Sequence, residues 1–450
     1  MSFEIPFSHI AEIIMGQSPK GEEVNNEGIG LPLLNGPTEF TDRYPAPVQH
    51  TAYAKKISLP GDILFCVRGS TTGRMNYSDQ KYCIGRGLAA IRGRNGYPTP
   101  YVKAVLETYL PKLLAAATGS TFPNVSKDLI NNIPVSVLPV ENACNISKLI
   151  ELQEEKVFTN NQINQTLEQM AQALFKSWFV NFEPVKAKMA VLEAGGSQED
   201  AMLAAMTAIS GKDDDALVVF EREHPEQYAE LKATAELFPS AMQESELGEF
   251  PAGWILGPLS DIAIFANEKV DISSLTSETY ISTENMLANR AGISTASSLP
   301  SVNSVPGFRS GHVLISNIRP YFKKIWLARF KGGRSADVLA FEARDSVTVE
   351  YIYNLLYQDS FFDFMMLTSK GVKMPRGDKT AIMGWQCVCP DKKVSYAFSK
   401  AVGEYYSFIE INNTQNKTLT QLRDTLLPKL LSGEIILPEA EQAVSEVENV

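Results

Sequence analysis

The sequence is poor in the residues that most enzymes use for chemistry at neutral pH. It contains four histidines and five cysteines, and the cysteines include no C-x-x-C pair. They are Cys66, Cys83, Cys144, Cys387 and Cys389. An odd number of cysteines without close pairs predicts reduced thiols rather than a disulfide framework or a zinc site. The histidines are widely scattered, so each is expected to be structural, and we expect no metal site.

Long apolar segments are also absent. No run of eighteen apolar residues occurs, and the N-terminal MSFEIPFSHI has neither a basic head nor an apolar stretch. These absences predict a cytoplasmic protein without membrane spans. A chain of 450 residues, 44% of them apolar, is expected to form two or three domains.

Motifs for catalysis are missing as well. A self-contained DNA methyltransferase needs a Gly-rich cofactor loop and an Asn/Asp-Pro-Pro-aromatic tetrad, and neither string occurs. Gly28-Ile-Gly30 lacks the third glycine of a dinucleotide fingerprint, and residues 371–380 mimic a phosphate loop with Arg376 at a required glycine. No set of paired carboxylates with a nearby lysine suggests a nuclease. We therefore expect no catalytic residues and no cofactor in this chain.

What the sequence does contain is an internal repeat. The segment NQTLEQMAQALFKSWF at 164–179 is followed 252 positions later by NKTLTQLRDTLLPKLL at 416–431. Apolar residues step by three and four in each copy, which predicts one seam of an amphipathic helix. The predicted seam comprises Leu167, Met170 and Leu174, then Leu419, Leu422 and Leu426, with Asn160 and Asn412 seven residues before as polar residues that fix register. Two unrelated surface helices are the alternative.

The repeat extends beyond the helices. Ile10-Ala-Glu12-Ile parallels Leu259-Ser-Asp261-Ile, Gly61-Asp-Ile-Leu64 parallels Gly311-His-Val-Leu314, and Gly119 and Pro123 parallel Gly371 and Pro375, at offsets of 249, 250 and 252. Short apolar runs broken by Gly and Pro predict strands within residues 1–140, with one helix at 100–117. We therefore predict two mixed α/β domains of one fold.

The predicted organisation has six parts. Residues 1–140 and 255–395 form the first and second mixed α/β domains, 141–183 a central helix, 184–254 an acidic helical linker, 396–435 a C-terminal helix and 436–450 an acidic tail. The linker could also bind a partner or regulate the protein.

Charge is distributed unevenly between these parts. The net charge of −11 argues against nucleic acid, but residues 1–140 carry +2 and residues 255–395 carry +3, whereas 141–254 carry −12 and 396–450 carry −4. Mildly basic domains on acidic helices suit a DNA reader whose helices face protein. A solvated acidic face is the simpler alternative.

Basic residues interleaved with hydroxyl and aromatic residues occur at equivalent places in the two domains, as expected of a groove reader. The DNA-binding candidates are Arg68, Ser70, Thr71, Arg74, Arg86, Asn124 and Lys127 in the first domain, and Arg319, Tyr321, Lys323, Lys324, Arg334, Lys370, Lys373 and Arg376 in the second. For any one of them, ordinary surface charge is the alternative.

Three strings together resemble a known family. Residues 163–175 in the first helix, ESELGEFPAGW at 244–254 and TLLPKLLSGEI at 425–435 are similar to the specificity subunit of Type I restriction-modification enzymes, and residues 119–128 look like the signature near the end of its recognition domain. The resemblance covers almost the whole chain. Residues 190–243 are longer than it requires.

The resemblance implies an α+β protein in which two target recognition domains are joined by two long conserved helices that form an antiparallel coiled coil. It implies that each domain reads one half of a split double-stranded DNA target, and that two modification subunits and the restriction subunits are partners. S-adenosylmethionine, ATP and Mg would then bind on those partners. A coiled-coil adaptor whose domains bind protein is the alternative function.

Overall fold

The computed structural model describes residues 3–118, 123–246 and 248–435. Residues 119–122 of the expected signature and the predicted acidic tail at 436–450 lie outside the described residues. The chain divides into two units, one comprising residues up to 163 together with residues from 411 onward, and the other comprising residues 164–410. Each unit contains one β-rich domain.

The first domain is built on two four-stranded sheets, with strand orders β2-β9-β6-β7 and β4-β3-β8-β5, and a two-stranded β1-β10 ribbon. The elements are β1 (Phe3–Pro6), β2 (Ala11–Met15), β3 (Leu31–Leu34), β4 (Gln49–Thr51), β5 (Ile57–Ser58), β6 (Ile63–Cys66), β7 (Met75–Tyr77), β8 (Tyr82–Ile84), β9 (Leu88–Gly93), α1 (Thr99–Ala115), α2 (Lys127–Asn132) and β10 (Pro134–Val137). The helix predicted at 100–117 and the strands predicted in this region are confirmed.

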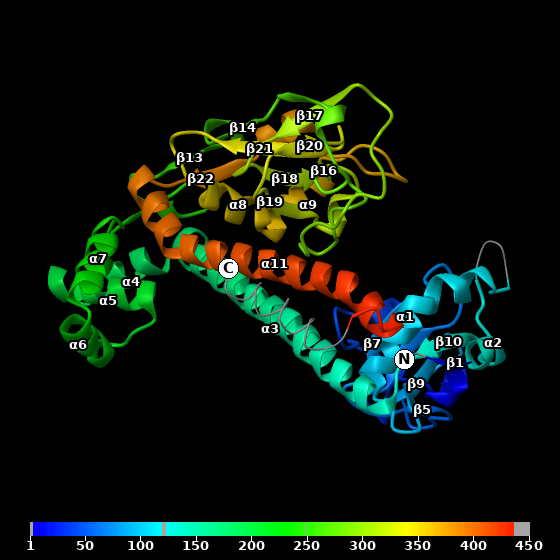
Figure 1. Cartoon of the computed structure of the whole chain (residues 1–450). Helices are drawn as coiled ribbons and strands as arrows, with labels where there is room; N and C mark the ends of the chain where they lie inside the picture. The colour runs from blue at the N-terminus through cyan, green and yellow to red at the C-terminus, as the bar shows by residue number, and fades with distance from the viewer. Residues whose placement is uncertain (1–2, 119–122, 247, 436–450) are drawn as a thin grey trace. The chain divides into compact units, whose positions relative to one another are not determined.

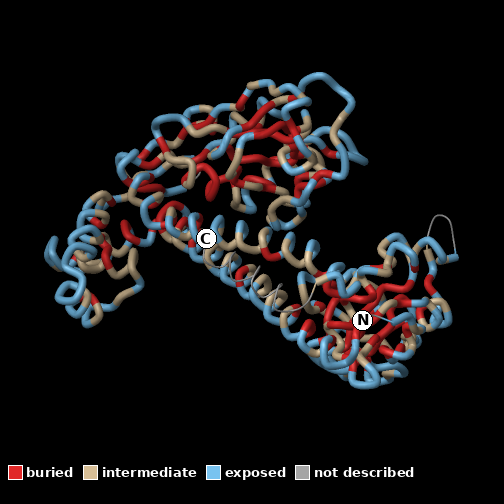
Figure 2. The backbone as a smooth tube through the Cα atoms, viewed as in Figure 1, coloured by how far each residue is buried: buried red, intermediate tan, exposed pale blue. Residues whose placement is uncertain are grey.

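Strand β6 shows why this domain has two layers of core. All four of its residues are buried, and successive side chains point to opposite faces of the sheet. Ile63 and Phe65 join the cluster that contains the apolar face of α1, whereas Leu64 and Cys66 join residues of the β3-β8 sheet. Figure 2 shows the buried residues gathered inside the domain.

The second domain repeats this topology, with sheets β14-β21-β18-β19 and β15-β17-β20-β16 and a β13-β22 ribbon. Its elements are β13 (Ile255–Pro258), β14 (Ala263–Phe265), β15 (Lys269–Asp271), β16 (Tyr280–Ile281), β17 (Ser304–Phe308), β18 (Val313–Ser316), β19 (Ile325–Leu327), β20 (Gly332–Arg334), β21 (Val338–Ala343), α8 (Val349–Tyr357), α9 (Asp359–Leu367), α10 (Lys379–Met383) and β22 (Gln386–Cys389). Helix α8 packs on β18 and β21 (Figure 1).

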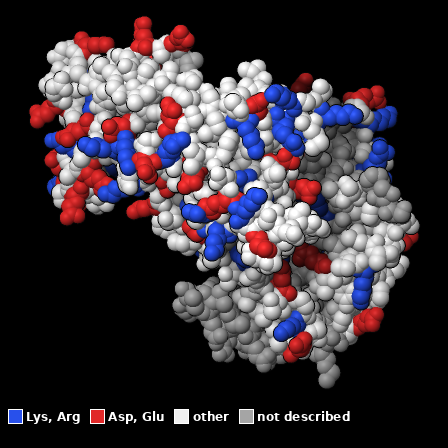
Figure 3. Space-filling view, turned by 90° about the horizontal axis from the view of Figure 1, so that it is seen from above, with Lys and Arg blue, Asp and Glu red and all other residues white. Residues whose placement is uncertain are grey.

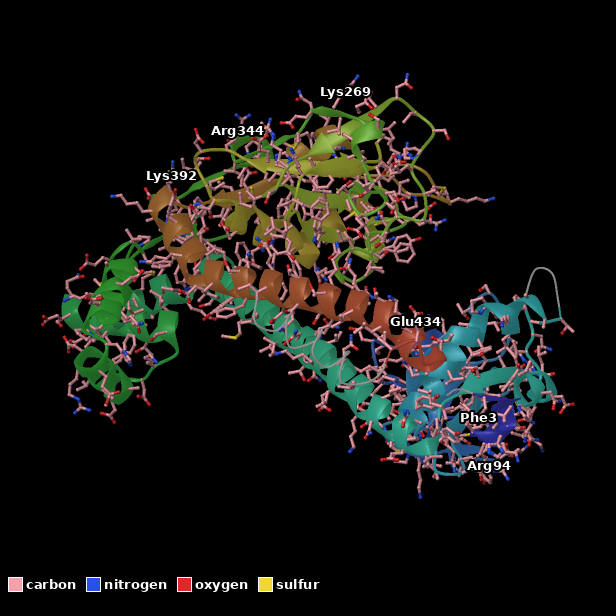
Figure 4. All side chains as sticks on the ribbon, in the orientation of Figure 1. Phe3, Arg94, Lys269, Arg344, Lys392 and Glu434 are labelled. Atoms are coloured by element: carbon pink, nitrogen blue, oxygen red, sulfur yellow. The ribbon has the colours of Figure 1, made fainter. Side chains whose placement is uncertain are left out.

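Equivalent hydrogen bonds align the two copies residue by residue. The N–H groups of Gly61 and Gly311 donate to carbonyls at 78 and 328, respectively, an offset of 250 on both sides. Arg94 and Arg344, labelled in Figure 4, begin the same turn after β9 and β21, and both are exposed. The duplication predicted from the sequence therefore extends to the strand pairing.

One predicted correspondence is wrong. Leu259 begins the short helix η4 (Leu259–Asp261), and its structural counterpart is Phe7, which begins η1 (Phe7–His9), rather than Ile10. The N–H groups of Phe7 and Leu259 donate to the carbonyls of residues 133 and 385, both at an offset of 252. Ile10 corresponds to Ile262, because both close the same helical turn. The sequence match was therefore shifted by one turn.

Two long helices, α3 (Val140–Phe179) and α11 (Lys392–Ser432), continue across the boundary between the units. In the first unit, Ile146 and Ile150 of α3 share a core with Leu427 and Leu430 of α11. Residues later in α3 face residues earlier in α11, so the paired segments are antiparallel. In the second unit the order is also antiparallel, because Phe175 and Trp178 near the end of α3 contact Phe398 near the start of α11.

The stretch predicted as an acidic helical linker has a core of its own. It contains α4 (Glu183–Glu193), α5 (Gln198–Ser210), α6 (Asp214–Glu223) and α7 (Pro225–Glu236), followed by the β11 (Met242–Gln243) and β12 (Phe250–Pro251) ribbon. Ala205, Met206, Leu217 and Ala235 are buried together between these helices. Residues 183–238 carry twelve Asp/Glu against five Lys/Arg, and acidic side chains are frequent at the left of Figure 3. This segment is a folded helical bundle rather than a simple connection.

Candidate nucleic-acid interface

Three loops of the first domain meet at one end of its β2-β9-β6-β7 sheet. The β6–β7 loop carries Arg68, Ser70, Thr71 and Arg74, of which Arg68, Ser70 and Arg74 are exposed. Backbone bridges pair Asn124 with both Arg68 and residue 118, and the Gly69 N–H donates to the carbonyl of residue 123. The structure therefore brings five of the predicted DNA-binding residues together.

Arg86 and Lys127 lie beside this cluster. Arg86 is exposed in the turn before β9, and the next residue, Gly87, accepts a hydrogen bond from the Val67 N–H at 3.0 Å. Lys127 is the exposed first residue of α2, whose N-cap Ser126 accepts a hydrogen bond from Leu129 N–H. We name the loops 68–74, 85–87 and 124–127 the first loop cluster.

The second domain assembles the same loops from different residues. Its β18–β19 loop, 317–324, contains Tyr321 and Phe322 in η6 (Pro320–Phe322), with ring centroids 4.6 Å apart and exposed fractions of 48% and 37%. The Arg319 N–H donates to the Pro375 carbonyl at 2.8 Å, the counterpart of the bond from Gly69. We name the loops 317–324 and 368–378 the second loop cluster.

Backbone conformation is preserved between these loops although the residues differ. Gly69 and Gly73 have φ of 97° and 96°, and their counterparts Arg319 and Lys323 both have φ of 50°. Residues other than glycine rarely adopt positive φ, and each such position costs about 1–3 kcal/mol. The second copy therefore keeps the loop shape and gains two cationic side chains, at the expense of local strain.

Several cations of the second loop cluster are already held by acidic residues. Lys323 pairs with Asp359 at 2.7 Å, Lys370 with Asp378 at 2.6 Å and Arg376 with Asp337 at 2.8 Å. The hydrogen bonds from Lys323 and Arg290 lower the pKa of the Asp359 carboxyl. Lys324 donates to the Thr283 carbonyl at 2.6 Å, and burial lowers the pKa of its ammonium group. Lys373 is exposed.

Arg334 must be removed from the predicted DNA-binding set. Its side chain is only 7% exposed and donates to the main-chain carbonyls of Gly307, Ala266 and Val338. It corresponds to Ile84 of β8, a fully buried core residue, rather than to the exposed Arg86. Arg334 is therefore a buried structural residue that connects segments of the second domain.

The helix pair of the first unit contains a polar layer at Asn160. Its side chain is 1% exposed, and Nδ2 donates to Gln415 Oε1 at 2.8 Å and Asn416 Oδ1 at 2.9 Å. Asn416 in turn donates to Asn161 Oδ1 at 2.8 Å. These bonds are satisfied in one alignment of the helices, since sliding by a turn would separate buried amides. Asn412 is partly buried.

The predicted apolar seam needs one correction. Leu419 is 7% exposed, and Leu174 and Leu426 pack against the cores of their units, whereas Leu167 and Leu422 are partly buried. Met170, however, is 46% exposed. The residues buried in the second unit are instead Ala171, Phe175 and Trp178, because the buried stripe is rotated by about one residue from the predicted one.

Comparison with known proteins agrees with this arrangement. Residues 5–169 match the model of the Type I restriction modification DNA specificity domain. The chain is 29% identical over 414 residues to the Type I restriction enzyme HindI specificity subunit of Haemophilus influenzae, covering 85% of this chain and 88% of that protein. The crystal structure of the S subunit from M. genitalium superposes with a TM-score of 0.50 at 13% identity, covering 96% of each chain, and so shares the fold. Over most of its length the chain is therefore similar to Type I restriction-modification specificity subunits.

The two copies of the domain dock differently on their helices. In the first unit, Lys103 of α1 pairs with Glu107 and with Glu154 of α3, both at 2.8 Å, beside a cavity of about 340 Å³. The equivalent positions in the second unit are Tyr353, Tyr357 and Tyr406, and the Tyr353 ring contacts the rings of the other two. An ion-paired triad in one copy is thus replaced by an aromatic triad in the other.

A second, mostly apolar groove of about 260 Å³ runs along the helix pair of the first unit. Leu149, Leu152, Leu422 and Leu426 line it, and Leu152 is 69% exposed. Exposed apolar side chains that line a groove between helices are typical of a surface that receives another helix. Leu149 and Leu152 are not among the seam residues predicted from the sequence, although they precede Asn160 at helical spacing.

The aromatic triad surrounds Glu168, which accepts a hydrogen bond from Gln172 at 3.2 Å. Burial raises the pKa of Glu168 to about 7. The ordinary pKa of a glutamate carboxyl is about 4.3, so between this pH and 7 Glu168 is protonated in the native state but ionised in the unfolded state. Its contribution to the free energy of unfolding is therefore fully present below about pH 4.3 and is lost as the pH rises through 7.

We expect Glu168→Gln to remove this pH dependence and to stabilise the protein at pH 8 by roughly 2–3 kcal/mol. Urea unfolding of both proteins at pH 5.5 and pH 8 measures it. Glu151→Gln, at an exposed position of the same helix, is the control and should leave the wild-type difference intact. An unchanged pH slope in Glu168→Gln would show that this carboxyl does not titrate as stated.

Among the residues that the structure describes, no helix is long and apolar enough to cross a bilayer. All five cysteines are unpaired.

Proposed function

We propose that this chain is a specificity subunit that recognises a bipartite double-stranded DNA target. The first loop cluster reads one half of the target and the second loop cluster reads the other. The observation that carries the proposal is the duplication of one loop scaffold with different side chains at its exposed positions. Equivalent backbone bonds hold both clusters, whereas Ser70 and Thr71 in one copy stand where Pro320 and Tyr321 stand in the other. Such a pair suits two unlike half-sites.

The charge and chemistry of the clusters support DNA as the ligand. Arg68, Arg74 and Arg86 are exposed beside hydroxyl side chains, which suits contacts with phosphates and base edges. The acidic residues are concentrated in the helices and the helical bundle, away from these loops in the sequence. The target sequence depends on base contacts that require a bound duplex.

We further propose that the helix pair binds two modification subunits and that restriction subunits join that complex. The apolar groove beside Leu152 supports docking of an amphipathic helix. S-adenosylmethionine, ATP and Mg would be held by those partners, since this sequence carries none of the motifs that bind them. In this proposal the chain contributes recognition and assembly but no catalytic group.

Arg74→Ala should weaken DNA binding by the assembled complex by a similar factor on all sequences and should reduce the salt slope by about one, because a lost phosphate contact releases one counterion fewer. Fluorescence anisotropy across a series of salt concentrations measures both quantities. Mapping of methylated sites, with the wild-type chain and without it, tests the function as a whole.

The matched control is Arg94→Ala. Arg94 is exposed and follows the last residue of β9, whereas the β6–β7 loop that carries Arg74 begins after Cys66. The antiparallel pairing of Cys66 with Leu88 places that loop and Arg94 at opposite ends of the sheet. The two variants lose the same charge. Equal effects of both on the salt slope would indicate that the first loop cluster is not the DNA-binding face.

A further inference from the structure

The second loop cluster contains a short finger with an apolar tip. Lys370 and Arg376 exchange two main-chain hydrogen bonds of 2.9 and 3.0 Å, and the five residues between them form the tip. Val372 is fully exposed and Met374 is 53% exposed. The DNA-binding residues predicted from the sequence include the cations of this segment but not these two apolar residues, although Gly371 and Pro375 delimit a turn. We name residues 370–376 the finger.

The finger is fixed to the rest of the loop cluster. A backbone bridge pairs Ile318 with Arg376, and the Arg319 N–H donates to the Pro375 carbonyl. The ion pair between Arg376 and Asp337 anchors its base. The apolar tip is therefore presented by a braced loop at the same end of the sheet as the cations.

Charge around the tip favours nucleic acid as the group that covers it. Lys370 and Arg376 form ion pairs with Asp378 and Asp337, and two further cations of this segment, Lys373 and Lys379, are exposed. Apolar side chains with cations on both sides match a DNA groove, where phosphates line the rims and base edges form the floor. An apolar protein partner would not require so many cations around two side chains.

The width of the finger selects the groove. Two paired backbone segments form a ribbon, and the major groove, about 12 Å wide, admits a two-stranded ribbon, whereas the minor groove is only about 6 Å wide. The apolar group on the base edges of the major groove is the 5-methyl of thymine. We propose that Val372 and Met374 contact thymine 5-methyl groups in the half-site read by the second domain.

This inference rests on the proposed DNA recognition and adds the kind of contact by which the second domain recognises its half-site. In the first copy, the β6–β7 loop offers the hydroxyl groups of Ser70 and Thr71 for hydrogen bonding, whereas the Thr72 hydroxyl donates within the loop cluster to the carbonyls of Gly69 and Pro123. In the second copy, Tyr321 and Phe322 replace Thr71 and Thr72, so apolar contact extends from the finger into the neighbouring loop. The two copies thus read DNA by different means.

The test removes single methyl groups from the DNA. Thymines of each half-site are replaced one at a time by deoxyuridine, and the affinity of the assembled complex is measured by anisotropy at fixed salt. With the wild-type chain, at least one replacement in one half-site should weaken binding about three- to tenfold. The double variant Val372→Ser/Met374→Ser should bind the thymine duplex more weakly by a similar factor and should not respond to that replacement.

Lys373→Ala is the matched control within the finger. It should weaken binding on all duplexes and keep the response to deoxyuridine, because it removes a charge and leaves the apolar tip. A wild-type complex that binds specifically but ignores every deoxyuridine overturns the inference alone, as does a double variant that still responds. A double variant that binds DNA normally but loses a partner subunit would assign the finger to a protein contact. Absence of specific binding by the wild-type complex would instead overturn the proposed function.

Discussion

Leu419→Asp is expected to unfold the helix pair of the first unit and to abolish assembly with a modification subunit. Leu419 is 7% exposed, and its carbonyl accepts a hydrogen bond from Gln153 of α3. An unpaired carboxylate at this position loses an apolar contact and places a charge in a buried seam, at a cost of about 3–5 kcal/mol. The first domain has a core of its own around β6, so its strands should survive.

Two further variants separate folding from docking. Leu152→Asp changes a leucine that is 69% exposed in the groove, so it should leave the urea midpoint unchanged and still block assembly. Thr414→Asp, at an exposed position of α11, should change neither property. Circular dichroism reports the helices, and sedimentation with the modification subunit reports assembly. Assembly of Leu419→Asp at normal affinity would contradict the assignment of this seam.

Much of this architecture was predictable because the duplication supplies two independent views of each element. A run such as Ile63–Cys66 is ambiguous alone, but its recurrence as Val313–Ser316 after another glycine identifies a buried strand with a fixed turn before it. The long helices were predictable from their spacing for the same reason. The resemblance to specificity subunits then connected these elements to a function.

The remaining errors have physical causes that one sequence does not reveal. Met170 was assigned to the seam because it follows Leu167 by three residues, yet a buried stripe is about 100° wide and its centre depends on which domain packs there. Ile10 was aligned with Leu259 because a short helical turn shifts an apolar match without changing its pattern. The bundle at 183–238 looked like a connection because its composition is acidic, although Ala201 and Ala205 have helical spacing.

The interface itself was predictable only as a set of loops. Arg68 and Asn124 lie far apart in the sequence, and their adjacency depends on the pairing of the chain around β6. A search for basic residues also could not select Val372, whose significance follows from its full exposure at the tip of a braced finger. The sequence shows where charged residues occur. The structure is needed to show which of their side chains are exposed to a ligand and which other side chains lie between them.

Arg334→Ala is expected to destabilise the second unit by roughly 2–4 kcal/mol, the other large effect that the structure predicts. The substitution removes the donors to three buried carbonyls, those of Gly307, Ala266 and Val338, and leaves a cavity beside them. Arg334→Lys should recover little of this loss, because one ammonium group cannot reproduce a planar guanidinium that bonds in several directions. Urea unfolding of the chain measures the loss.

The alternative, a direct DNA contact by Arg334, gives a different pattern. A phosphate contact would leave the urea midpoint unchanged and would lower both affinity and salt slope, as expected for Arg74→Ala. Lys331→Ala provides the control, since Lys331 is exposed in the turn just before β20 and carries the same charge. Because burial lowers the pKa of Arg334 and three carbonyls surround it, we expect the stability of the fold, rather than the salt slope, to respond. A normal midpoint with a reduced salt slope would return Arg334 to the DNA-binding surface.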